Sequence, residues 1–212
     1  HSKRRLLMAD YKPSNAPANL SMNDFLSASN AAGQFAKGCR FAVRIVPTGS
    51  AVVGLRSDDL IYMCDAVEYP GRGFDVTQVR YYGPSQVFPN NTLYNTANLS
   101  FLCRARSPER AFFDDWMEII NPSNTFNFEY ADNYFCRVDI FQFAEYGTGS
   151  GATRPDMIAK YKGQAAPTYM WSLQRAWPTL VAPQQVTWAD QDVLRLQVTF
   201  SYKYWERPGY SK

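Results

Sequence analysis

The side chains that most often catalyse reactions are few in this sequence and lie far apart. The only histidine is His1, so Ser-His-Asp catalysis, Cys-His catalysis and most zinc hydrolase sites are excluded. Gly71–Gly73 is too short for a phosphate-binding loop and no helix follows it. The paired carboxylates Asp58–Asp59 and Asp114–Asp115 are sequence neighbours that point apart in regular structure, so they make poor acid–base dyads. The sequence predicts no catalytic residue and no enzyme.

The cysteines also lack the spacing of a metal site. Cys39, Cys64, Cys103 and Cys136 form no Cys-x-x-Cys pair and have no histidine nearby. We therefore expect no metal and no cofactor. Each cysteine lies in a strand-like run, which favours reduced core residues of a cytosolic product.

Composition favours one globular domain with a large core. The chain has 212 residues, of which 46% are hydrophobic and 16% aromatic. Its 22 basic and 19 acidic residues give a net charge of +3, and the only compact basic run is Lys3–Arg5, which does not suit a dedicated nucleic-acid binder. No apolar run approaches the ~20 residues of a membrane helix, so we expect no membrane insertion.

The longest regular pattern is at the end of the chain, in residues 193–204. Apolar or aromatic residues alternate there with polar ones, which predicts a strand with one buried face. At ~3.3 Å per residue this strand would span roughly 40 Å. Its polar face carries Arg195, Gln197, Thr199, Ser201 and Lys203.

Shorter patterns predict the remaining strands, bounded by Gly, Pro and Asn turns. We expect strands at residues 39–46, 60–67, 74–82, 99–104, 126–130, 134–144 and 168–176. A turn is expected at Asn90–Asn91, a hairpin around Ala131–Asn133, and a strand end at Trp177–Pro178.

One helix is predicted between Ser107 and Asn121. Ser107 is the expected cap, Pro108 suits the first turn, and the residue before Pro122 disfavours helix. One face carries Phe112, Phe113, Trp116, Met117 and Ile120, and the other carries Asp114, Asp115 and Glu118. The expected fold is therefore mainly β, an antiparallel barrel or sandwich of about eight strands with one flanking α-helix.

The order of these elements resembles the tail tube proteins of T-even-type contractile-tailed bacteriophages. The resemblance covers roughly residues 35–205. It is carried by Phe35–Phe41 before the first strand, the Cys64 strand running into Pro70-Gly71, Phe113 and Trp116 on the helix, Ala176-Trp177-Pro178, and the closing Leu196–Tyr202 and Tyr204-Trp205.

The resemblance implies a β-barrel subunit with one flanking helix, a fold shared with lambda-type and type VI secretion tube proteins. Six subunits form a ring, and rings stack into the inner tail tube. The implied partners are the protein itself, the sheath protein, baseplate proteins and the tape-measure protein, with DNA passing through during ejection without being held. The implied location is the virion tail, assembled in the host cytoplasm.

Three segments depart from a minimal tube subunit. These are an N-terminal arm at 1–34 and insertions at 47–59 and 147–166 within a domain spanning 35–207, which a tail at 208–212 follows. The arm fits either a flexible tail or a segment that orders on a neighbouring subunit, with a short helix at 21–30. Extra loops also suit a baseplate–tube junction protein, which starts the tube, or a terminator-side protein.

Within this family two surfaces are candidates for function. Asp114, Asp115 and Glu118 would form a sheath-facing acidic patch, or simply a solvated helix face. The polar face of the last strand would line the lumen or meet a neighbouring subunit. We expect Arg195 and Lys203 to pair with carboxylates or face a neighbour there, because unpaired cations would hold DNA; a solvated face is the alternative.

Two unrelated functions fit the same β-rich composition. A carbohydrate-binding sandwich would use Trp171, Trp177 or Trp188 as exposed stacking platforms. A hydrolase would draw carboxylates from distant strands, as glycosidases do.

Overall fold

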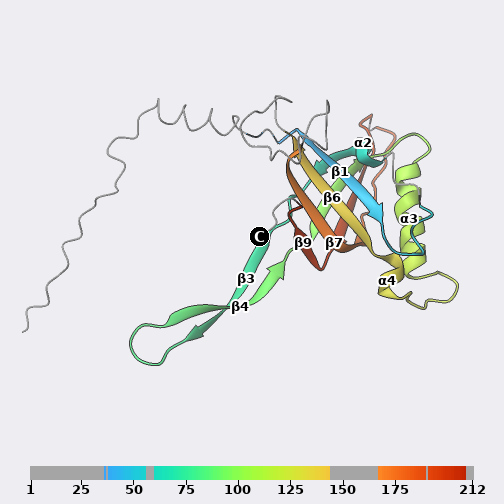
Figure 1. Cartoon of the computed structure of the whole chain (residues 1–212). Helices are drawn as coiled ribbons and strands as arrows, with labels where there is room; N and C mark the ends of the chain where they lie inside the picture. Colours follow the sequence, from blue (N-terminus) through green and yellow to red (C-terminus); the bar gives the residue numbers. More distant parts are fainter. Residues whose placement is uncertain (1–35, 37, 56–59, 144–166, 190, 209–212) are drawn as a thin grey trace, which may run out of the picture.

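Seven antiparallel strands form one curled sheet, which is the body of the molecule (Figure 1). The computed structural model describes residues 36, 38–55, 60–143, 167–189 and 191–208. The sheet order is β1-β6-β7-β8-β5-β2, and β9 also pairs with β7. The bounds are β1 Phe41–Pro47, β2 Cys64–Val67, β5 Ala97–Leu102, β6 Cys136–Phe143, β7 Pro167–Val181, β8 Arg195–Ser201 and β9 Tyr204–Glu206.

Strand β7 organises this sheet because it pairs along both of its edges. Its first part pairs with β6, while Ser172–Gln174 pairs with β9 and Trp177–Val181 pairs with β8. Strands β8 and β9 therefore follow one another along the same edge of β7. They are separated at Tyr202–Lys203, opposite Arg175, whose φ of 56° puts its backbone in the left-handed region.

The long helix α3, Pro108–Ile120, lies against the sheet and covers its apolar side (Figure 1). Its Phe113 ring lies 5.2 Å from Phe101 of β5 and 6.1 Å from Phe200 of β8, measured between ring centroids. Trp116 is fully buried beside Phe200 and donates its indole N–H to the Tyr134 carbonyl at 3.0 Å. Aromatic packing of this kind joins the helix and the sheet in one core.

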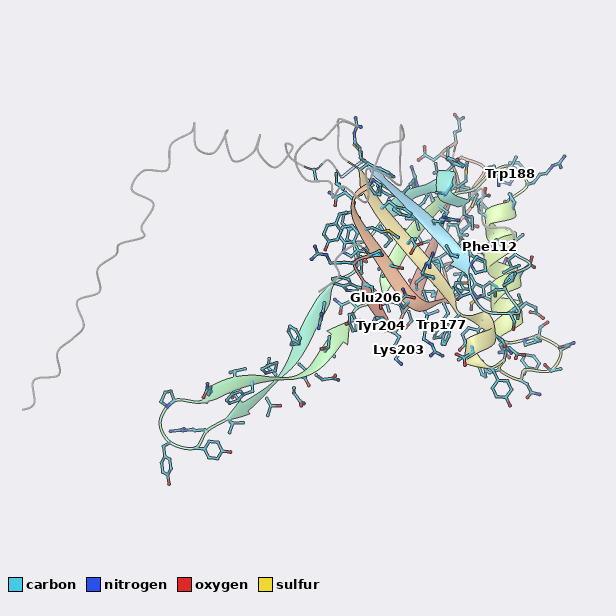
Figure 2. All side chains as sticks on the ribbon, in the orientation of Figure 1. Phe112, Trp177, Trp188, Lys203, Tyr204 and Glu206 are labelled. Atoms are coloured by element: carbon cyan, nitrogen blue, oxygen red, sulfur yellow. The ribbon has the colours of Figure 1, made fainter. Side chains whose placement is uncertain are left out.

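Strands β3, Arg72–Val79, and β4, Gln86–Tyr94, form a separate two-stranded hairpin that projects away from the body (Figure 1). Its base is attached by an edge-to-face contact between Tyr94 and Tyr202, with centroids 6.1 Å apart. Trp205 also donates a hydrogen bond to the Gly71 carbonyl at 3.3 Å. Beyond this base the hairpin side chains extend into solvent on both faces (Figure 2).

The predicted class, an antiparallel β fold with one flanking helix, is confirmed, with nine strands among the described residues. The apolar face of the helix is also confirmed, since Phe112, Phe113, Trp116 and Ile120 are buried and Met117 is half-buried. On the last strand, Leu196, Val198, Phe200 and Tyr202 are buried as the alternation predicted.

Three element predictions were wrong in the first two-thirds of the chain. Residues 60–67 start as a short helix, α2 Leu60–Met63, before β2, because a short apolar run does not distinguish helix from strand. Asn90–Asn91 lies inside β4 rather than in a turn. Residues 126–130 form no strand, and the expected hairpin turn is the helix α4, Ala131–Tyr134.

Two predictions were wrong near the end of the chain. Strand β7 does not end at Trp177–Pro178 but continues to Val181, because the pairing with β8 shifts register between Pro178 and Leu180 and so tolerates a proline. The single twelve-residue strand at 193–204 is instead β8 and β9, interrupted opposite Arg175.

Two expectations about single residues also fail. Ser107 makes no side-chain cap, because its φ of 47° turns the hydroxyl towards the Arg104 carbonyl at 3.5 Å. The cysteines are free, and burial raises the pKa of the Cys136 thiol to about 12, but Cys39 is exposed rather than part of the core.

Several predicted segments lie outside the described residues, namely the arm 1–34 with its short helix, the insertion 147–166, the Asp58–Asp59 pair and most of the C-terminal tail. The domain boundaries therefore stay predictions. The described part of segment 47–59 is hydrogen-bonded to α4, since the Ala51 backbone N–H donates to the Asn133 carbonyl at 3.1 Å. A Cβ on Gly49 would lie only 2.1 Å from the Asn133 carbonyl oxygen, so this position accepts no larger residue without a backbone shift.

Candidate functional site

The outer face of β8, opposite the aromatic core, is the polar surface predicted from the sequence. Arg195 and Gln197 are exposed there, and Thr199 and Ser201 are half-buried. Lys203 is exposed too, but it lies in the break between β8 and β9 and so outside the regular face. Its pairing stays a prediction.

Arg195 pairs with a carboxylate, as the sequence predicted. Its Nε lies 3.0 Å from Oδ2 of Asp65, on the edge strand β2. Both side chains are partly exposed, so the pair contributes little to stability. Its main effect is to compensate the only cation on the regular face of β8.

A hydrogen-bonded row crosses the same face from β8 to the residue after β2. Thr199 donates its hydroxyl to the Asn98 side-chain oxygen at 2.8 Å, and the Asn98 amide donates to Glu68 at 2.7 Å. These residues line a shallow hollow with Leu180 and Gln197. The face is therefore polar and ordered, and it carries one more carboxylate than cation among Asp65, Glu68 and Arg195.

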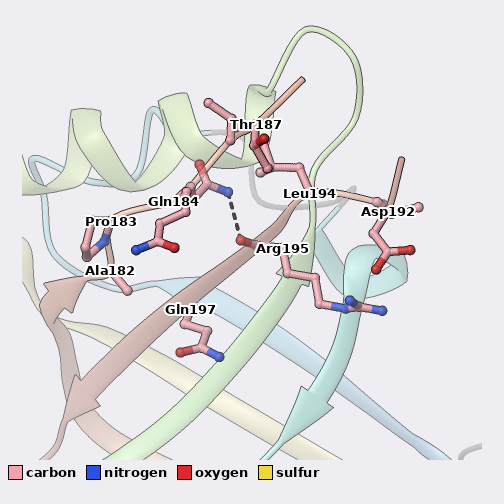
Figure 3. A pocket seen from close by; sticks show the side chains of 11 residues that line it. Ala182, Pro183, Gln184, Thr187, Asp192, Leu194, Arg195 and Gln197 are labelled. Carbon is pink, nitrogen blue, oxygen red and sulfur yellow. Dashed lines mark hydrogen bonds between the residues drawn. The ribbon is translucent and has the colours of Figure 1, made fainter. Parts of the chain in front are cut away.

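An open groove lies at the end of this face, between residues 182–187 and 192–197 (Figure 3). Gln184 closes part of it by donating its side-chain amide to the Arg195 carbonyl at 2.9 Å. Asp192 and Arg195 are the titratable residues that line it. Across the described part of the chain, no three His, Cys, Asp or Glu side chains come together to hold a metal ion.

Asp114, Asp115 and Glu118 of α3 are exposed together, on the side of the helix away from the core. Asp114 forms an ion pair with Arg110 at 2.9 Å. Glu118 accepts hydrogen bonds from the Ser123 backbone N–H and hydroxyl, which lowers the pKa of its carboxyl. The helix lies on the apolar side of the sheet, so these residues and the polar face of β8 form two separate surfaces.

The projecting hairpin is a third surface, which sequence reasoning missed. Phe74, Val76, Val87, Phe88 and Leu93 are about half exposed on its two strands. At its tip, Tyr81 and Tyr82 are 87% and 98% exposed. Few monomeric proteins leave such an apolar surface in water unless it contacts a partner.

The tryptophans do not form the exposed platform that a carbohydrate-binding module would need. Trp171 is half-buried and stacks on Tyr69 with centroids 4.5 Å apart, and Trp177 packs at the edge of the core. Of the three candidates, Trp188 alone is fully exposed, at the tip of the loop between β7 and β8 (Figure 2).

Comparison with known families matches residues 36–207 to the phage tail tube protein family. The chain belongs to this family. A comparison with curated proteins finds no match. Among the described residues of this tail tube protein, no helix has both the length and the apolar character to cross a membrane.

Solved structures from contractile injection systems share the tail tube fold. One chain comes from the sheath-tube complex of an extracellular contractile injection system (PVC) in the extended state, with a TM-score of 0.57 and 14% identity over 89% of this chain and 98% of that one. Another comes from the anti-feeding prophage baseplate, with a TM-score of 0.55 and 14% identity over 82% and 95%. A third, from the PVC sheath/tube terminator, has a TM-score of 0.52 and 14% identity over 79% and 92%.

Glu109 fixes the start of α3 in this tail tube protein. Its buried carboxylate accepts hydrogen bonds from the Arg104 backbone N–H at 3.1 Å and from the Arg104 guanidinium at 2.6 Å. Burial alone would raise the pKa of the Glu109 carboxyl. The bonds from Arg104, together with the residue's own backbone N–H, outweigh burial and hold that pKa below its usual value.

Replacing Glu109 with Gln should lower the free energy of unfolding at pH 7 by about 1–3 kcal/mol, because hydrogen bonds to a carboxylate are lost. A carboxyl with a depressed native pKa stabilises the fold above its unfolded pKa of about 4.3, and this stabilisation is lost as pH falls through the native value. Urea unfolding should therefore show a smaller difference between the two proteins at pH 3. Asp115→Asn, an exposed helix carboxylate, is the control, and an unchanged Glu109→Gln difference at pH 3 would contradict this account.

Proposed function

We propose that this protein is a structural subunit of a phage tail tube, in which six copies form a ring and rings stack into a conduit for DNA. The apolar hairpin β3–β4 carries this proposal. Its exposed side chains have no cover within the described part of the subunit, so assembly is the simplest way to remove them from water. The role is structural rather than catalytic.

The two ends of the sheet formed by the described strands support the same function. The hydrogen-bonded path of the described strands ends at β1 on one side and at β2 on the other. The last strand of a sheet can pair with another chain, and a ring of subunits would use both ends of this path. Rotational symmetry also lets one surface of each copy meet a different surface of the next.

The solved relatives support the proposed partners. Their titles name a sheath-tube complex, a terminator and a 6-fold symmetrised baseplate. By analogy this chain would form hexameric rings, contact a sheath and a baseplate, and enclose a tape-measure protein before DNA. It would reside in the virion after assembly in the host cytoplasm. The baseplate relative also favours a second candidate, a tube-initiating junction protein.

Electron microscopy of the concentrated, purified chain tests the assembly. Long hollow tubes of stacked six-fold rings are expected in negative stain. Single rings would instead favour the initiator or terminator role. A particle that stays monomeric at every concentration, and does not join the other tube proteins of its phage, would contradict the proposal.

Within such a ring, we assign the polar face of β8, β5 and β2 to the lumen. Each phosphate that a protein cation neutralises adds affinity for DNA through counterion release. The pair of Arg195 with Asp65, and the carboxylate of Glu68 beyond it, leave this face without an uncompensated cation on its regular part. A lumen of this kind would let DNA pass without holding it.

Removing the compensating carboxylate should make the protein bind DNA. In Asp65→Asn, Arg195 loses its partner, and we expect the variant to bind duplex DNA in a salt-sensitive way. The fall of log affinity with log salt should become steeper by about one for each contacting subunit. Fluorescence anisotropy of labelled DNA over a salt series measures this slope. Asp115→Asn makes the same charge change on α3, and equal binding by both variants would refute the lumen assignment.

The acidic residues of α3 remain our proposal for the sheath contact, because they face away from the core on the flanking helix. Exposed charge pairs are individually weak, about 0–1 kcal/mol, which suits a sheath that must slide during contraction. Reversing the charge of Asp114, Asp115 and Glu118 together should abolish sheath co-assembly while leaving tube formation intact. Normal sheath assembly on the triple variant would refute this assignment.

A further inference from the structure

The segment Phe126–Tyr130, between α3 and α4, exposes an aromatic side chain at every second residue. Phe126, Phe128 and Tyr130 are 72%, 78% and 83% exposed. The segment belongs to no helix or strand of the described chain, and Phe126 has a left-handed backbone with a φ of 55°. Three exposed rings within five residues form a surface suited to contact another molecule, and we call residues 126–130 the aromatic segment.

The aromatic segment is held in a fixed shape by its neighbours. Phe126 donates its backbone N–H to the Pro122 carbonyl at 2.8 Å, and Glu129 donates its own to the Ile120 carbonyl at 2.9 Å. The Glu129 carboxylate accepts a hydrogen bond from the Asn133 side-chain amide at 2.6 Å. These bonds hold the backbone that carries the rings, which lowers the entropic cost of ordering the segment on binding.

The tip of the hairpin has the complementary composition. Arg80, Tyr81 and Tyr82 are all exposed there, and the turn that follows contains Gly83 at a φ of 80°. Tyrosine and arginine are the residues most enriched, with tryptophan, among those that dominate binding energy at interfaces. In Figure 1 the tip extends away from the body on a different side from α4, so it points away from the aromatic segment of its own subunit.

Charge separates the two surfaces in the same way. Residues 121–134, which include the aromatic segment and α4, carry two acidic residues, Glu129 and Asp132, and no basic residue. Residues 72–94, which form the hairpin, carry two arginines and one aspartate. A basic aromatic tip and an acidic aromatic surface on the same chain attract one another between copies.

We propose that the hairpin tip of one subunit docks on the aromatic segment of a second copy. Tyr81 and Tyr82 would pack against Phe126, Phe128 and Tyr130, and Arg80 would pair with the Glu129 carboxylate. The contact joins two different surfaces, so it repeats from copy to copy as a ring or stack requires. This inference rests on the proposed tube function and adds the acceptor surface of the hairpin.

Photo-crosslinking in assembled protein maps the contact directly. The full-length chain would carry benzoylphenylalanine in place of Tyr82 and be mixed with isotope-labelled wild type before assembly. Mass spectrometry should find mixed-isotope crosslinks between position 82 and residues 126–130. Tubes that crosslink elsewhere, on another part of the chain or on added sheath protein, would overturn the docking while leaving the tube function standing. Protein that neither assembles nor crosslinks would overturn both.

Charge exchange provides an independent measurement. Arg80→Glu should raise the protein concentration needed for assembly at least tenfold, and Glu129→Lys in the same chain should restore it in part. Arg106→Glu reverses another exposed arginine and should have little effect.

The aromatic part of the contact has its own test. Phe128→Ser should also raise the protein concentration needed for assembly, while Trp188→Ser, at another exposed ring, should not. Equal effects of the test and control variants would overturn the docking.

Discussion

The contact of α3 with β5 and β8 is the constraint on which the other surfaces depend. Phe113 and Trp116 lie between the helix and the sheet and meet Phe101 and Phe200 there. Because side chains alternate along a strand, burying Phe200 and Val198 on one side commits Thr199 and Gln197 to the other. The aromatic core therefore determines both the outer position of the helix and the direction of the polar face.

The second organising element is β7, which has a left-handed backbone at Arg175, where its pairing changes from β9 to β8. The strained Arg175 backbone faces the break between β8 and β9, and its guanidinium forms an ion pair with Asp132 and lies 4.7 Å from the centre of the Phe135 ring. Both partners flank α4 or belong to it. Arg175 therefore lies at the end of the regular polar face and also contacts the region next to the aromatic segment.

The sequence predicted what depends on periodicity and failed where periodicity has no unique meaning. Strict alternation located the buried and polar faces of β8, and helical spacing located the core face of α3. The apolar run at 60–67 was too short to show that it forms the helix α2 followed by the strand β2. Pro178 was wrongly predicted to end β7, because only the pairing register shows that this proline lies at an irregularity of the strand. The exposure of Phe74 and Phe88 was beyond prediction, since alternation identifies apolar positions without showing what covers them.

Membership of the tail tube family explains why this subunit departs from the rules for a stable monomer. A lone two-stranded hairpin is marginal in water, and this one also exposes apolar side chains on both faces. The hydrogen-bonded path of the described strands also ends at β1 and at β2, where a strand from another chain would extend the sheet. Each feature is unfavourable in isolation, and each is removed by a neighbour that presents an edge or an apolar surface. In the proposed tube, the hairpin and the ends of the sheet would therefore gain free energy at their contacts with other copies.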